Sequence, residues 1–157
     1  MRKRIINHHT QRSSPQNERW LDLEKLATVE VSSEEAQHPI EAALVPGVPS
    51  GWRAAAPGQQ LVRLMFDEPQ NLRQIHLVFD EREQERLQEY TLRWSSGGGQ
   101  PYQEIVRQQY TFSPPTTTTE VEEYNVNLNS CAELELSIVP DLRGSAAHAS
   151  ISEFRLA

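Results

Sequence analysis

The chain has 157 residues, of which 37% are hydrophobic and 24% are charged, and its formal net charge is −7. This length fits one domain with a hydrophobic core of its own. No apolar run approaches the roughly 18 residues that a membrane-spanning helix needs, so we expect no such helix and no membrane partner.

The charge is divided unevenly along the chain. Residues 1–19 carry five basic side chains and one acidic one, whereas residues 20–157 carry ten basic and 21 acidic side chains. The polar residues 1–19 are predicted to be a flexible basic leader, and residues 20–157 to form the folded domain. Because a domain this acidic repels phosphate backbones, we expect no nucleic-acid partner.

The single cysteine, Cys131, cannot form an internal disulfide, which favours a reducing compartment. The basic N-terminus also lacks the apolar stretch of a secretory signal. We therefore expect a cytoplasmic protein, and a monomer.

Alternating apolar residues predict short strands along most of the domain. Val29 and Val31 indicate the first strand, and a loop with a short helical turn follows over 32–44. Two prolines and two glycines in "VPGVPSGW" then predict a loop with fixed bends. Further strands are predicted at 61–66, 72–79, 89–94, 104–112, 122–128, 133–139 and 151–157.

Two local features refine this pattern. The glycine-rich segment 95–101 predicts a hairpin turn between the strands 89–94 and 104–112. The spacing from Ile151 to Phe154 breaks strict alternation and predicts an irregularity in the last strand. No segment after residue 45 has the period of a long helix, so the fold class is all-β: an antiparallel β-sandwich of the jelly-roll kind.

The order of several motifs resembles the discoidin or coagulation-factor type C domain, which has the galactose-binding-like jelly roll. The matching stretches are "LATVEVSSEEA", "EAAL" with "SGWRA", "QQLVRLMFDEPQNLRQIHLVF", "YTLRWSSGGGQPYQEIV", "AELELSIVPD" and "ASISEFRLA". The resemblance covers about residues 20–157. It implies a non-catalytic module with a ligand site on loops at one end, and relatives bind sugars, phospholipid head groups or proteins.

Candidate ligand-binding residues lie in the segments expected to be loops. Arginine suits hydroxyl and carboxylate groups because its planar fork makes paired hydrogen bonds. Trp52 either packs in the core or stacks on a sugar ring. Arg86 is an alternative to Arg82 within the charged run 80–86. The predicted set is His38, Trp52, Arg53, Arg82, Arg143 and His148.

The resemblance also implies a structural calcium between the loop after the first helical turn and the last strand. Here that loop, "LVPGVPSGWRA", has no carboxylate, and Glu153 is the one residue that matches a usual ligand. Calcium takes six to eight oxygen ligands, typically with carboxylates among them. We therefore expect no cofactor, with Glu153 as the ligand if a calcium ion is held.

No arrangement of catalytic residues is visible, so we expect no enzyme activity. Two functions remain open. One is carbohydrate binding through the loops at one end of the sandwich. The other is a protein–protein interaction module of the cell interior with no sugar ligand, which the missing signal and missing disulfide favour.

Overall fold

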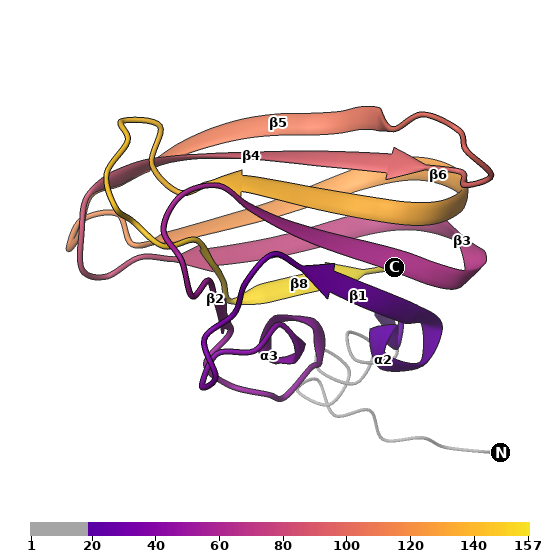
Figure 1. Cartoon of the computed structure of the whole chain (residues 1–157), viewed down its shortest axis with the longest axis horizontal. Helices are drawn as coiled ribbons and strands as arrows, with labels where there is room; N and C mark the ends of the chain where they lie inside the picture. Colours follow the sequence, from indigo (N-terminus) through magenta and orange to yellow (C-terminus); the bar gives the residue numbers. More distant parts are fainter. Residues whose placement is uncertain (1–18) are drawn as a thin grey trace, which may run out of the picture.

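The structure is a computed structural model that describes residues 19–157. The predicted leader, residues 1–19, therefore lies outside the described residues except for Arg19. Most of the domain is β-structure (Figure 1). The elements are α2 (Leu23–Leu26), β1 (Ala27–Val31), α3 (Glu41–Leu44), β2 (Trp52–Arg53), β3 (Gln60–Asp80), β4 (Arg86–Ser95), β5 (Gln103–Phe112), β6 (Thr119–Val139), β7 (Ser150–Ile151) and β8 (Glu153–Leu156).

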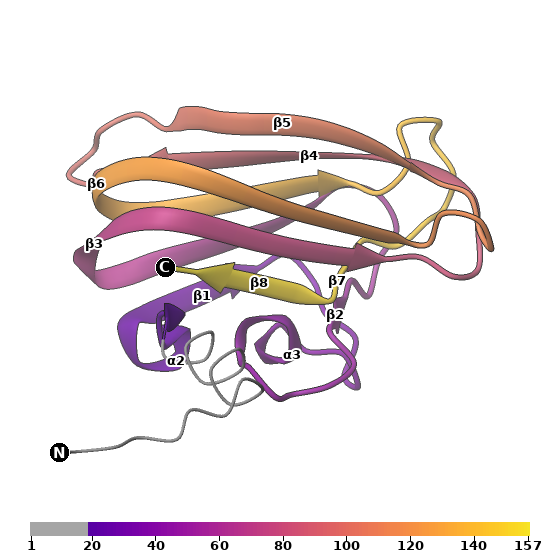
Figure 2. The ribbon, with the colours of Figure 1, turned by 180° about the vertical axis from the view of Figure 1, so that it is seen from behind.

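Two long bent strands, β3 and β6, run through both layers of a sandwich. The first half of β3 pairs with β1, and its second half pairs with β8. The second half of β6 pairs with β4, which pairs with β5. The large layer is thus β1, β3, β6, β4 and β5, and the small layer is β8 with the other halves of β3 and β6 (Figures 1 and 2). The predicted antiparallel β-sandwich is confirmed.

The strands predicted at 61–66 and 72–79 form one continuous strand, β3. Those predicted at 122–128 and 133–139 likewise form one continuous strand, β6. The polar residues between the members of each pair form the bend, where the register of β3 against β6 shifts. Such shifts accommodate the change of direction without ending the strand. The predicted irregularity after Ile151 is also present, because Ser152 separates β7 from β8.

The hydrophobic core lies between the layers and comes from the alternating positions of the strands. Leu64, Leu77, Leu92 and Leu136 have no exposed surface. At roughly 1.5–3 kcal/mol for each large buried side chain, this core is the main favourable term of folding. Its residues leave only the loops and the outer sheet faces for binding.

The loop end is the end of the sandwich formed by the connections 54–59, 81–85, 113–118 and 140–149. They meet there because Asp80 pairs with Thr119, Arg86 with Phe112 and Gln60 with Ile138. In Figure 1 this end is on the left. No helix of residues 19–157 has the length and apolar character needed to cross a membrane.

Candidate functional site

A polar cavity of about 210 Å³, which we call the loop-end cavity, lies among these connections. Strand ends and loops distant in sequence contribute its walls. The lining residues are Arg53, Asp80, Glu81, Arg82, Glu83, Gln84, His148 and Ser150. Three of the predicted ligand-binding residues, Arg53, Arg82 and His148, therefore come together at one cavity.

The loop 81–85 is held in place by Arg86, the first residue of β4. Its guanidinium is fully buried, donates through Nη1 to Gln88 and to the Pro140 carbonyl, and pairs through Nε with Glu81 at 2.7 Å. Burial favours a higher pKa for Glu81, but the hydrogen bonds from Arg86 and the backbone outweigh it and lower the pKa. The sequence left Arg86 as an alternative to Arg82 for contacting the ligand. That alternative is wrong, because the Arg86 side chain is fully buried and a ligand cannot reach it.

The anchoring of Glu81 leaves the next side chain, Arg82, pointing away from the core. The Arg82 side chain is 75% exposed, and Asp80 is 4.0 Å away. Asp80 is itself occupied, since its two carboxylate oxygens accept from the hydroxyls of Thr119 and Ser152 at 2.6 Å each. Arg82 thus keeps donors that a ligand can use.

Arg53 and His148 are oriented by different partners. Arg53 pairs with Glu35 at 2.7 Å through Nε and is 45% exposed. The Nδ1 atom of His148 lies 2.8 Å from the Ala54 carbonyl oxygen, which can only accept, so Nδ1 carries a hydrogen. In the neutral ring the other nitrogen, Nε2, is then an acceptor.

The cavity therefore combines donors with acceptors at short range. Arg53 and Arg82 donate, Glu83 accepts, and Gln84 and Ser150 do both. A hydroxyl group also donates and accepts, so this lining matches a polyhydroxylated ligand. The sequence did not single out Gln84 or Ser150. Gln84 could have been found from its place in the charged run 80–86, which follows a predicted strand. No feature of the sequence pointed to Ser150.

The stacking role of Trp52 is wrong. Its side chain is 1% exposed, and its indole N–H donates to the Ser33 carbonyl, so it packs in the core. No aromatic side chain from residues 19–157 lines the loop-end cavity. Recognition there would depend on hydrogen bonds and not on ring stacking.

Two other predicted residues lie outside the cavity. Arg143 pairs with Asp141 and Glu85, in the connection 140–149. Burial favours a higher pKa for Asp141, but hydrogen bonds from Ser145, Leu87 and Arg143 lower it to about 2. His38 donates through Nδ1 to the Ser50 carbonyl at 3.1 Å, which steadies the loop after α3. For both residues the ligand-binding role stays a prediction.

The residues near Glu153 do not fit a calcium ion. Glu153 Oε2 lies 3.1 Å from Nε2 of His76, and the adjoining loop 46–51 has no carboxylate. Arg82 and Arg155 line the same cleft as Glu153 and would repel a cation. Among residues 19–157 no cluster of three or more His, Cys, Asp or Glu side chains could hold a metal.

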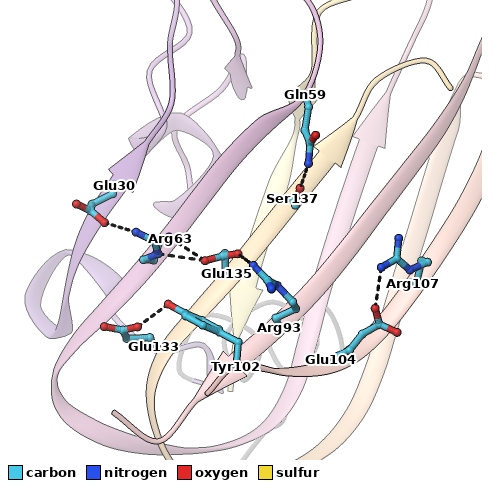
Figure 3. Close-up of polar contacts among 10 residues, drawn as sticks. All are labelled: Glu30, Gln59, Arg63, Arg93, Tyr102, Glu104, Arg107, Glu133, Glu135 and Ser137. Atoms are coloured by element: carbon cyan, nitrogen blue, oxygen red, sulfur yellow. Dashed lines mark hydrogen bonds and ion pairs between the residues drawn. The ribbon is translucent and has the colours of Figure 1, made fainter. Parts of the chain in front are cut away.

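The outer face of the large layer carries many charged side chains, but these side chains form ion pairs with one another (Figure 3). Glu135 points outward on this face, yet it is only 2% exposed because Arg63 and Arg93 both pair with it. Arg63 also reaches Glu30 at 2.9 Å. This face is a self-satisfied ionic surface and a weaker candidate for a ligand site.

Comparison with solved structures supports the galactose-binding-like jelly roll. The family 32 carbohydrate-binding module of NanJ from Clostridium perfringens, solved with galactose, has a TM-score of 0.62 at 15% identity, covering 87% of this chain and 96% of that chain. A pectin-binding module gives a TM-score of 0.61 at 17% identity, covering 84% and 90%. The chain also matches 28% of a GH29 fucosidase from Ruminococcus gnavus, at a TM-score of 0.63 and 10% identity, covering 94% of this chain.

At these identities the structural likeness establishes the fold. The fold is that of carbohydrate-binding modules, and it also occurs as part of a larger enzyme chain. No protein-family model matches the sequence, and no curated protein does. The function must therefore be argued from the site.

Proposed function

We propose that the chain is a non-catalytic carbohydrate-binding module whose loop-end cavity binds one residue of a saccharide. The observation that carries this proposal is the convergence of Arg53, Arg82 and His148 on a cavity that Glu83 and Gln84 also line with acceptors. Neighbours of the same fold are named for galactose or pectin binding, which agrees with this chemistry.

The size of the cavity limits the ligand. Its volume of about 210 Å³ is smaller than the roughly 300–1,000 Å³ of sites for drug-sized molecules, so it suits a single sugar ring. A shallow site without a stacking platform gives little apolar burial. We therefore expect a weak affinity that several modules or several contacts would have to reinforce.

A glycan array followed by calorimetry tests the proposal. The wild-type chain should bind a defined set of glycans, and Arg82→Ala and His148→Ala should each weaken binding about tenfold, which is the loss of roughly 1.4 kcal/mol. Arg107→Ala is the matched control, because it removes one exposed arginine from the outer sheet face. An array without hits, or hits that survive both cavity variants, contradicts the proposal.

A protein ligand is the second candidate. Val48 and Leu142 are large apolar side chains that are 43% and 41% exposed, and both lie on loops. Contact with another protein would remove this apolar surface from water, which is favourable. If the array is blank, Leu142→Asp should abolish capture of a stoichiometric protein partner, and its failure to do so would count against this candidate.

A further inference from the structure

A second and larger cavity, which we call the β8 cleft, lies beside the loop-end cavity. It has a volume of about 710 Å³ between the loop 47–51 and the small layer. The small layer contributes Val78, Asp80, Glu153 and Arg155 to its lining, and the adjoining connections contribute Arg82 and Ser152. Asp80 and Arg82 line both cavities, so the two adjoin each other.

The loop that forms one wall of the β8 cleft is held in a defined shape. Gly51 has a φ of +64°, and a side chain there would meet the Ile151 carbonyl oxygen at 2.5 Å. Ser50 has a φ of 85°, a conformation that non-glycine residues seldom adopt, and its carbonyl accepts from His38. The cleft is therefore formed by a loop that packs tightly against β7.

Arg155 is the unusual residue of this cleft. It is 7% exposed, and its Nη1 donates to the carbonyls of Ala43 and Phe154. Among the residues that the structure describes, no carboxylate lies within ion-pair distance of its guanidinium. A buried cation without an anionic partner is costly, and burial accordingly lowers the pKa of Arg155.

Neither acid of the cleft forms an ion pair with Arg155, although the charge of Glu153 partly offsets the effect of burial on its pKa. Both oxygens of Asp80 accept from Thr119 and Ser152. Glu153 Oε2 is turned toward His76, whose other ring nitrogen lies 2.9 Å from Glu123. Arg155 and Arg82 are therefore the cationic groups of the cleft with donor capacity left for an anion.

We propose that the β8 cleft is an anion subsite that takes the carboxylate of an acidic sugar residue, with Arg155 as its buried donor and Arg82 at the shared rim. The planar fork of a guanidinium matches the two oxygens of a carboxylate. Such a ligand would supply the negative charge that Arg155 lacks. This inference rests on the proposed function, because the neighbouring sugar residue would occupy the loop-end cavity.

The test compares tri-galacturonic acid with its fully methyl-esterified form, in which each carboxylate is replaced by a neutral methyl ester. Calorimetry should show that the wild-type chain binds the acid at least tenfold more tightly than the ester. Arg155→Lys, which keeps the charge and loses the fork, and Arg155→Met should each reduce this preference to less than threefold. The control Arg107→Met should keep the wild-type preference for the acid, because it removes an exposed arginine from the outer sheet face.

A second measurement covers the case in which the Arg155 variants fail to fold. In the wild-type chain, the Nε–H resonance of Arg155 should shift on titration with the acid and stay in place with the ester. Equal affinity for acid and ester overturns the anion subsite and leaves the proposed function intact. A preference that survives in the Arg155 variants, or an Arg155 resonance that stays in place with the acid, also overturns it.

Absence of binding by both forms overturns the subsite as well. The glycan array then decides the proposed function separately, because it contains neutral glycans that do not need Arg155.

Discussion

The outer face of the large layer and the loop end both carry many charged side chains, but they use them in opposite ways. On the outer face, Glu135 is held by Arg63 and Arg93 and is 2% exposed (Figure 3). Tyr102 donates to Glu133 on the same face, and burial together with this hydrogen bond raises the pKa of Tyr102 to about 12. At the loop end, Arg82 is 75% exposed and its nearest carboxylate lies 4.0 Å away.

This difference shows why charge density is a poor guide to a binding site. Paired charges on a sheet stabilise the fold modestly and present few donors to a ligand. Charges whose partners are absent or already occupied keep their hydrogen-bonding capacity. We therefore expect substitutions on the outer face to change stability, and substitutions at the loop end to change binding.

The largest effect on stability is expected at Arg86, which stabilises the fold and also holds the loop 81–85 of the loop-end cavity in place. Arg86→Leu removes the buried partner of Glu81 and the donor to Gln88 and Pro140. Loss of one member of a buried ion pair typically costs about 3–5 kcal/mol, so the free energy of unfolding should fall by about 3 kcal/mol. Urea unfolding measures this, and a change below about 1 kcal/mol would mean that Arg86 does not anchor the loop.

The second effect concerns the pH dependence of stability at Glu120, which is 1% exposed beneath the loop end. Burial, with a further contribution from Glu122, raises the pKa of Glu120 from 4.5 to about 8. The folded state then holds more protons than the unfolded state between these values. The free energy of unfolding should therefore fall as the pH rises from 4.5 toward 8.

Glu120→Gln removes this titration and keeps the shape of the side chain. The variant should lose less stability than wild type across that range, and the difference between the two proteins should be largest at pH 8. Urea unfolding at pH 5, 6.5 and 8 gives both slopes. Parallel slopes for the two proteins would show that Glu120 ionises normally in the fold.

A smaller effect is expected for Glu135→Gln on the outer face. The neutral amide cannot satisfy both Arg63 and Arg93, so the free energy of unfolding should fall by about 1–2 kcal/mol. Saccharide affinity should stay within twofold of wild type, because the outer face lies apart from both cavities. A fall in affinity without a fall in stability would reverse the roles assigned to the two regions.

The smallest effect on stability is expected for Arg82→Gln. This exposed side chain has no close ion pair, so the free energy of unfolding should change by less than about 0.5 kcal/mol. Saccharide affinity should nevertheless fall about tenfold. Thermal unfolding and calorimetry on the same sample separate the two quantities, and a variant that binds normally would remove Arg82 from the site.

Much of the fold could be predicted because hydrophobic alternation reports which strand face is buried. Leu134, Leu136 and Ile138 show this clearly, since all three are fully buried as expected. Alternation could not show that β3 continues through its polar bend, because a bend and a turn have similar compositions. It also gave no means of deciding between the two roles of Trp52.

The site was predictable only in part because it depends on which partners each side chain finds. Arg53, Arg82 and His148 come together, whereas Arg143 is held by Asp141 and Glu85. Arg155 passed unnoticed, because an arginine between Phe154 and Leu156 reads as an ordinary outward position on a strand. Its burial follows from α3, which covers that face through the Ala43 carbonyl.

The most direct test of the central claim is a two-dimensional ¹H–¹⁵N NMR titration of the wild-type chain with methyl β-galactopyranoside and with tri-galacturonic acid. At least one of these saccharides should shift the resonances of residues 81–85, His148 and Ser150 and leave those of Arg63, Arg93 and Glu135 in place. Shifts confined to the outer sheet face, or no shifts with either saccharide at millimolar concentration, would contradict the claim that the loop end is a carbohydrate-binding site.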